Sequence, residues 1–416
     1  MEKMQLAIVG CGGMGYRHLR GLRALEESGH NPFELVGCCD TRADNAAYVA
    51  DEAEKALGKR PRTFGTIAEM KEALPELQAV DVTTPNGTHH VVVQQAFDAG
   101  LHVLCEKPMA LTIRGANIMI EAWKKSGKVL SVAENFRRDP ICRLTKALLD
   151  AGVIGKPYVL FHTGAGSGNG IIIVPNRHDK YSAGFVTSSG VHTTDLMMYY
   201  LGDIEEVFAR TKQWEPIRYK KNMRSVSSFY AHWQAEIPDE VHATAEDTLI
   251  SVFTYKSGAL GQWTVFLAGH GKGFSFGGVY GSEGSLRLPG PRSGQPVIVH
   301  RDDVGEIPQD KLLEYVPDFH LDEKTATLFG ADRLTSYEGG MDFSDAAIIA
   351  QEYWELGDCI LTGKQPEVNP YVGRRDLAAV YAAHESNVIN RPVTLDEIEA
   401  ETTAVYEQDI NEYWGI

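Results

Sequence analysis

The stretch QLAIVGCGGMG, residues 5–15, decides how the first part of this 416-residue chain folds. Residues 5–9 have the apolar composition of a short buried strand, and a GxGxxG pattern follows at once and opens a helix. Glycines in such a turn let backbone N–H groups approach a pyrophosphate on the helix N-terminus. The order of strand, turn and helix therefore predicts a dinucleotide site at Gly10, Gly12, Gly13, Met14 and Gly15.

The next apolar stretch, residues 33–39, reads as a second strand and ends at Asp40, Thr41 and Arg42. A carboxylate at this point can accept hydrogen bonds from an adenosine ribose, and it repels a 2′-phosphate. The sequence thus favours NAD over NADP. Arg42 leaves NADP open, because a guanidinium can stack on adenine or contact a phosphate.

Strand and helix patterns alternate as far as residue 132, which predicts a doubly wound parallel sheet. Helices are expected at 43–57, from 66, around 89–97 and at 112–126, and further strands at 63–64, 79–83 and 129–132. Ligands of such sheets collect at the carboxyl ends of the strands. The candidates there, besides the glycine turn, are Thr84, Pro85, Asn86, His89 and Asn135.

A second stretch, GLHVLCEKPM at residues 100–109, ends an apolar strand abruptly at Glu106-Lys107-Pro108. Pro108 disfavours helical geometry at Lys107 and keeps the lysine extended as it leaves the sheet. Taken alone, this pair could equally be a solvated strand end. Its place at the same sheet edge makes Glu106 and Lys107 candidates for the ligand crevice.

Beyond residue 137 the pattern changes to strands at hairpin spacing, near 156–163, 204–211, 247–255, 258–268, 273–280 and 284–288. We therefore expect a Rossmann domain at 1–137 and an α+β domain at 138–416 with a large, mostly antiparallel open sheet. A helix at 190–201 carries His192 and Asp195. Residues 212–245 are predicted to be a long inserted loop, typical of a lid, an oligomer arm or disorder. Helices at 343–361 and 376–389 could pack back on the first domain.

Composition limits the partners of the chain. The net charge of −16 argues against nucleic acid or an anionic membrane surface and favours a small molecule. No signal peptide or membrane span is recognisable, so a cytoplasmic location is expected. The six cysteines form no CxxC pair, so neither disulfides nor a metal site is predicted.

The motifs AIVGCGGMG, TTPNGTHH, AGLHVLCEKPMALT, AENFRRDP and GVHTTDLMMYYLG together resemble the glucose-fructose oxidoreductase, inositol dehydrogenase and rhizopine-catabolism (Gfo/Idh/MocA) family over nearly the whole chain. The resemblance implies nicotinamide-dependent oxidation or reduction of a sugar or cyclitol hydroxyl. It also implies that Lys107 and His192 flank the reacting carbon. The chemistry independently needs a base near the hydroxyl, and a histidine or a lysine with a lowered pKa suits that task.

One departure from the family pattern concerns the residue four positions before the histidine. Members often carry an aspartate there, and this chain has Ser188. A serine cannot orient an imidazolium by charge, so the role of that aspartate is expected to lie elsewhere. Asp195, one turn further on, is interpreted as structural.

Three functions remain open at this stage. The first is an NAD-dependent dehydrogenase acting on a secondary hydroxyl of a sugar, glycoside or cyclitol. The second is an NAD-dependent glycoside hydrolase that oxidises its substrate transiently and eliminates the aglycone. The third is a non-catalytic sensor, which would have no need of the pair Lys107 and His192.

The substrate is expected to contact Lys107, Arg137, Arg177, His178, Ser188 and His192. Because cations cluster at 137–138 and 176–180 in an acidic chain, an acidic sugar such as a uronate or sulfonate is a further hypothesis. A homo-oligomer, dimer or tetramer, is predicted from the open sheet. Trp263, Val265 and Phe266 are expected to form an apolar patch on its outer face.

Overall fold

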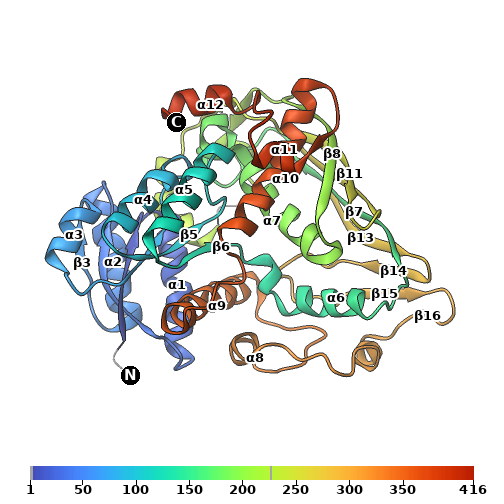
Figure 1. Cartoon of the computed structure of the whole chain (residues 1–416), viewed down its shortest axis with the longest axis horizontal. Coiled ribbons are helices and arrows are strands. Elements are labelled where there is room, and N and C mark those ends of the chain that lie inside the picture. The colour runs from blue at the N-terminus through green and yellow to red at the C-terminus, as the bar shows by residue number, and fades with distance from the viewer. Residues whose placement is uncertain (1–2, 225–226) are drawn as a thin grey trace.

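The computed structural model describes residues 3–224 and 227–416, and it contains two large sheets (Figure 1). The first sheet is parallel, with strand order β3-β2-β1-β4-β5-β6. This confirms the predicted doubly wound sheet. Its strands are β1 (Met4–Val9), β2 (Phe33–Cys39), β3 (Arg62–Phe64), β4 (Ala79–Val82), β5 (His102–Glu106) and β6 (Leu130–Ala133).

Helices connect these strands, as a parallel sheet requires. They are α1 (Gly13–Glu27), α2 (Ala43–Leu57), α3 (Ile67–Ala73), α4 (His89–Asp98) and α5 (Ile113–Ser126). Thr66 caps α3 by accepting the N–H of Glu69, as its sequence predicts. All strands point the same way, so the segments after β1, β4, β5 and β6 meet at one edge.

The second sheet has nine strands in the order β16-β15-β14-β13-β7-β12-β11-β8-β17. Its pairs are antiparallel except for β7 with β12, which confirms a mostly antiparallel sheet. Its strands are β7 (Pro157–Ser167), β8 (Ile204–Lys212), β11 (Thr248–Tyr255), β12 (Leu260–Gly269), β13 (Phe274–Gly281), β14 (Gly284–Arg287), β15 (Ile298–Arg301), β16 (Gly305–Glu306) and β17 (Val393–Thr394). The last three were not predicted, because segments of two to four residues show no usable alternation.

Two helices extend beyond their predicted starts. The helix α7 (Gly184–Leu201) begins before Gly190, which is an interior position where a Cβ would lie 2.7 Å from the Trp263 indole. This glycine serves close packing and does not start the helix. The helix α10 (Pro370–Ile389) begins at Pro370, because the Asn369 side chain caps its first turn.

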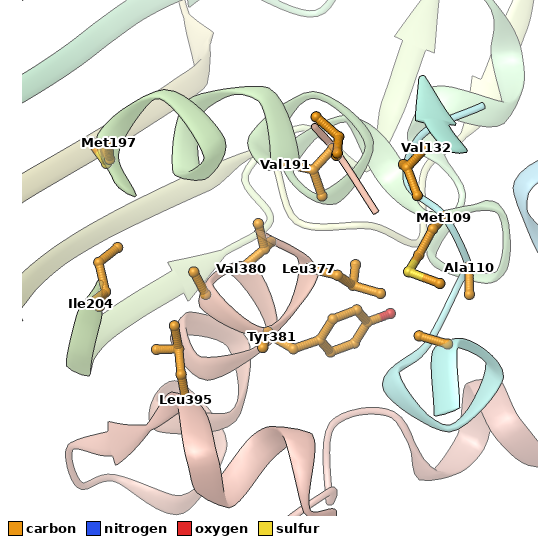
Figure 2. Close-up of a cluster of buried hydrophobic side chains, with 14 of the residues drawn as sticks. Met109, Ala110, Val132, Val191, Met197, Ile204, Leu377, Val380, Tyr381 and Leu395 are labelled. Atoms are coloured by element: carbon orange, nitrogen blue, oxygen red, sulfur yellow. The ribbon is translucent and has the colours of Figure 1, made fainter. Parts of the chain in front are cut away.

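Helices from the end of the chain join the two sheets into one body. The helix α10 lies between α7 and α5, and Figure 2 shows Leu377, Val380 and Tyr381 filling the space between Val191 and the segment Met109-Ala110. The helix α9 (Gly340–Thr362) packs along α1. The remaining helices are α6 (Pro140–Asp150), α8 (Glu323–Phe329), α11 (Leu395–Glu399) and α12 (Gln408–Trp414). In the described part of the chain no helix is both long and apolar enough to span a membrane.

The expected loop at 212–245 contains local structure in its described residues. Two short strands, β9 (Ile217–Tyr219) and β10 (Glu240–His242), form an antiparallel ribbon, and a 3₁₀ helix spans Ser228–Glu236. This 3₁₀ helix lies against α1. We call residues 213–246 the strap.

The apolar patch predicted on the outer sheet face needs a correction. Trp263 is fully buried on the inner face against α7, and Val265 shares that face because it pairs with buried Leu249. Alternation of side chains along a strand puts Phe266 on the opposite face. The exposed apolar residues of the outer face are instead Ile250, Val252, Leu260, Phe274, Tyr280 and Ile298.

Replacing Trp263 by alanine should lower the free energy of unfolding by about 3–5 kcal/mol, because it leaves a large cavity beneath α7. Chemical denaturation followed by circular dichroism measures this change. The control is Val304→Ala at the exposed tip between β15 and β16, which should change stability by less than about 0.5 kcal/mol. Equal effects of the two substitutions would contradict the packing described for Trp263.

Candidate active site between the two domains

Two adjoining cavities open at the carboxyl edge of the parallel sheet. The Rossmann cavity, about 490 Å³, is lined by the glycine turn, residues 40–42 and 83–86, and part of the strap. The sheet cavity, about 380 Å³, lies between α7 and the second sheet. Met14, Lys107, Arg177 and Tyr230 line both. A molecule in one cavity can therefore meet a molecule in the other at Lys107.

The glycine turn fits a pyrophosphate. Gly10 has a φ of +97°, and a Cβ there would lie 2.6 Å from the backbone nitrogen of Thr84. A Cβ on Gly15 would lie 2.3 Å from the Gly10 carbonyl oxygen, so Gly15 supports the turn without lining the cavity. At Gly12 nothing lies within 4 Å of the Cβ position. The start of α1 is therefore open to an anionic group.

Asp40 is fixed at the wall of the Rossmann cavity. Its carboxylate accepts the N–H of Cys11 at 2.7 Å and the N–H of Arg42 at 2.8 Å. The Arg42 guanidinium is shared by two other carboxylates, Asp44 and Glu236 of the strap, with nitrogen–oxygen distances of 2.8–3.3 Å. Arg42 thus has its donors directed at protein carboxylates.

Lys107 leaves β5 buried and reaches across to α7, where its Nζ lies 3.3 Å from the Ser188 carbonyl oxygen. Burial lowers the pKa of Lys107 to about 8, although the neighbouring Glu106 carboxylate opposes this. Burial also disfavours ionisation of Glu106, but the hydrogen bond from His18 and the Lys107 cation hold the pKa of Glu106 well below its usual range. His18 in turn lies 2.9 Å from Asp81.

His192 faces a carboxylate that comes from the other domain. Its Nδ1 is hydrogen-bonded to Glu134, which follows β6. The ring is stacked on Phe136 at a centroid distance of 3.9 Å, and the Arg292 guanidinium lies 4.7 Å from the other side of Phe136. Burial and the cations Lys107 and Arg292 keep the pKa of His192 well below its ordinary value. Burial raises the pKa of Glu134 to about 7.

Ser188 occupies the position where the family resemblance implies an aspartate. Its hydroxyl accepts a hydrogen bond from Arg177 at 2.6 Å and donates one to the Gly184 carbonyl. Ser188 therefore makes no contact with His192 of the kind an aspartate would supply. Glu134 provides the carboxylate that Ser188 lacks.

Five predicted site residues lie outside both cavities: Gly15, His89, Asn135, Arg137 and His178. His89 bridges the carbonyl oxygens of Thr84 and Pro108. Arg137 is paired with Asp195, which is buried on α7, and His178 accepts the N–H of Ile172. The buried side-chain amide of Asn135 has no hydrogen-bond partner among the described residues. Arg138 is paired with Glu355, so of Arg137, Arg138 and Arg177 only Arg177 lines a cavity.

Sequence reasoning missed several residues of the site. Glu134, which contacts His192 and lines neither cavity, follows a buried strand at the same edge as Glu106, and that signal was available. The strap residues Tyr230, Trp233 and Glu236 carried no such signal, because nothing in their pattern shows that the strap crosses to the Rossmann cavity. In the described part of the chain no cluster of three or more His, Cys, Asp or Glu residues is arranged to hold a metal ion.

Comparisons with known proteins agree with this architecture. Residues 4–134 match the family model "Oxidoreductase family, NAD-binding Rossmann fold", and residues 142–287 match the C-terminal domain of the same family. D-apiose dehydrogenase of Paraburkholderia graminis is 30% identical over 216 residues, which are 51% of this chain and 54% of that protein. Myo-inositol 2-dehydrogenase of Thermotoga maritima is 28% identical over 62% of this chain and 67% of that protein.

Among solved structures, an NAD binding oxidoreductase from Klebsiella pneumoniae has the same fold, with a TM-score of 0.73 and 24% identity over 95% of this chain and 99% of that chain. The two family models together match more than half of the chain. The glycine turn and the segment Glu106-Lys107-Pro108 lie in the first matched range and His192 lies in the second, and Lys107 lines both cavities. The chain belongs to the Gfo/Idh/MocA family of NAD-binding oxidoreductases.

Proposed function

We propose that the protein is an NAD-dependent oxidoreductase that transfers a hydride at a secondary hydroxyl of a sugar, glycoside or cyclitol. The observation that supports this most directly is the meeting of Lys107 and the buried His192–Glu134 pair at the junction of the two cavities. Relatives named for D-apiose and myo-inositol act on polyhydroxylated carbon skeletons, which fits such a junction.

His192 is the base in this proposal. Its Nε2 makes no hydrogen bond to the described residues, and the ring is neutral at neutral pH, so it can take the hydroxyl proton. The imidazolium that forms is balanced by Glu134 on Nδ1. Lys107, when protonated, donates a hydrogen bond to the same hydroxyl oxygen and stabilises its developing negative charge. Bound in the Rossmann cavity, where the glycine turn and Asp40 would hold it, NAD would supply the acceptor for the hydride of the carbinol carbon.

The alternative of an NAD-dependent glycoside hydrolase is not favoured, because the relatives compared above are named as dehydrogenases. A non-catalytic sensor would not need a neutral buried histidine paired with a carboxylate, whereas the proposed reaction uses both His192 and Glu134.

We also propose that the protein forms a homo-oligomer through the outer face of the second sheet. The exposed apolar residues defined above share one face of the sheet and come from β11, β12, β13 and β15, with Ile250 and Val252 on β11 and Phe274 on β13. An apolar surface of this kind is typical of a subunit interface.

Loss of either candidate catalytic side chain should reduce turnover while NAD still binds. His192→Gln and Lys107→Met should each lower kcat by about 10²–10⁴-fold, the range typical of a general acid–base group. The control is Lys180→Met, which removes a nearby cation that pairs with Asp409 and lines neither cavity. Unchanged kcat in Lys107→Met would contradict the assignment, and calorimetric titration with NAD checks cofactor binding.

The pH dependence follows from the same groups. Glu134 must be ionised to balance the imidazolium, so kcat/KM for oxidation should rise with pH through about 7, the pKa to which burial raises this carboxyl. Lys107 loses its proton above its pKa of about 8, so kcat/KM should fall again there. Glu134→Gln should remove the acidic limb and keep the alkaline one. An acidic limb that persists in Glu134→Gln would exclude this role.

Cofactor selection should depend on the carboxylates around Arg42. The wild-type protein should bind NAD more tightly than NADP, because Asp40, Asp44 and Glu236 repel a 2′-phosphate, and Asp44 and Glu236 also occupy the Arg42 guanidinium. Asp40→Ser and Glu236→Gln should each reduce the ratio of the NADP to the NAD dissociation constant. For Glu236→Gln we expect a reduction of about threefold to tenfold, because the Arg42–Glu236 ion pair is half exposed. Glu240→Gln, which removes a charge elsewhere on the strap, is the control. Equal or tighter NADP binding by the wild type in calorimetry would contradict this selection.

The oligomer should dissociate when charge is placed on the outer sheet face. Ile250→Glu combined with Val252→Glu should convert it to a monomer, because burying unpaired carboxylates is costly. Val304→Glu, at an exposed tip, should leave the assembly intact. Light scattering after size exclusion gives the mass, and a monomeric wild type at micromolar concentration would refute the interface.

A further inference from the structure

The sheet cavity extends well beyond the catalytic pair. On α7 its lining residues are Ser189, His192, Thr193, Leu196, Met197 and Tyr200, which form one stripe at helical spacing. From His192 to Tyr200 the helix rises by about 12 Å at 1.5 Å per residue. The cavity is therefore long enough for a second group beyond the one that stands at His192.

The two ends of this cavity differ in charge. The charged residues that line it all make contacts at the end near His192. They are Arg17, Lys107, Arg177 and Arg292. Lys107 and Arg177 bond to Ser188 at the N-terminal half of α7. Arg292 stacks on Phe136 beside His192, and Arg17 shares Asp345 with Arg292.

Further along α7 the stripe consists of Leu196, Met197 and Tyr200, and the second sheet adds Leu160, His162 and Leu288 to the lining. His162 and Leu288 both neighbour Gly277, and Leu160 lies two residues before His162 on the same face of β7. We call these six residues the apolar lobe. None of these side chains carries a charge at neutral pH, since burial lowers the pKa of His162 to about 4 and raises that of Tyr200 well above its usual value. His162 Nδ1 is buried and has no partner among the described residues. The lobe thus offers few hydrogen-bonding groups and no ionic one.

The lining of the apolar lobe favours some substituents of a sugar over others. A hydroxyl-rich group in the lobe would lose hydrogen bonds to water without replacing them, at about 1–3 kcal/mol each. A diphosphate, as in a nucleotide sugar, would place charge against Leu160, Leu196 and Leu288. An uncharged apolar group would instead gain from burial.

We propose that the substrate is a glycoside whose uncharged, apolar aglycone, such as an aryl group, occupies the apolar lobe while its sugar ring stands between Lys107 and His192. This inference rests on the proposed function, because it takes His192 as the place of the oxidised ring. It narrows the substrate from polyols in general to glycosides with an apolar substituent.

The test compares matched 4-nitrophenyl and methyl glycosides of several sugar configurations, the free sugars, and a uridine diphosphate hexose. Formation of NADH and release of nitrophenol are both recorded. We expect kcat/KM for the aryl glycoside to exceed that of its methyl partner by about tenfold to hundredfold, the gain of burying one aromatic ring. Calorimetric binding of the aryl glycoside to the NAD-loaded protein gives a readout independent of turnover.

A variant of the lobe shows whether this preference arises there. Leu196→Gln should lower the ratio of kcat/KM for the aryl glycoside to kcat/KM for the methyl glycoside to about one. The matched control is Met198→Gln on the same helix, whose side chain does not line the cavity. Thermal unfolding by circular dichroism confirms that both variants are folded.

The possible outcomes distinguish a failure of the aglycone lobe from a failure of the proposed dehydrogenase function. Equal kcat/KM for aryl, methyl and free sugars, or a preference for the nucleotide sugar, would overturn the aglycone lobe and leave the dehydrogenase standing. Nitrophenol release without net NADH, lost in Leu196→Gln, would support the lobe and overturn the dehydrogenase. If no NADH forms and the aryl glycoside does not bind, both the aglycone lobe and the dehydrogenase are overturned.

Discussion

Pairing of buried charge is the constraint on which this structure depends. The second domain covers much of the carboxyl edge of the parallel sheet, so the ionisable groups that are buried there lose water and need partners. Arg17 is held by Asp345, His18 by Asp81 and Glu106, and Arg137 by Asp195. Because most cations and carboxylates of this region neutralise one another, the few that remain at the cavity surface determine its chemistry.

These pairs also set how the domains meet. Arg17 is on α1 and Asp345 on α9, while Glu134 follows β6 and His192 is on α7. The apolar packing around α10 in Figure 2 lies against two of these elements, α7 at Val191 and β6 at Val132. The polar pairs fix how these helices and strands are shifted along one another, and the apolar side chains fix the distances between them. Both therefore hold the reacting groups in place.

Much of this could be predicted from the sequence, because local signals were strong. The glycine turn, Asp40 and the strand that ends at Lys107 each combine a residue type with a strand terminus, and the parallel topology brings them together. His192 followed from the family motif. The pairing of His192 with Glu134 could not be read directly, since the two are 58 residues apart and belong to different domains. Arg137 and His178 carried the right chemistry for a site, but buried partners elsewhere occupy them.

The contacts of the strap affect how the cofactor can leave the Rossmann cavity. The Trp233 indole donates to Asn45 at 2.9 Å, and His232 stacks on Tyr48 with ring centroids 3.8 Å apart, so the strap is fastened to α2 beside the Rossmann cavity. A dinucleotide beneath the strap would need these contacts and the ion pair at Arg42 to open before it could leave. The sheet cavity borders the described part of the strap at Ser227, Phe229 and Tyr230. We therefore expect the small molecule and the cofactor to exchange in separate events, with the cofactor leaving more slowly.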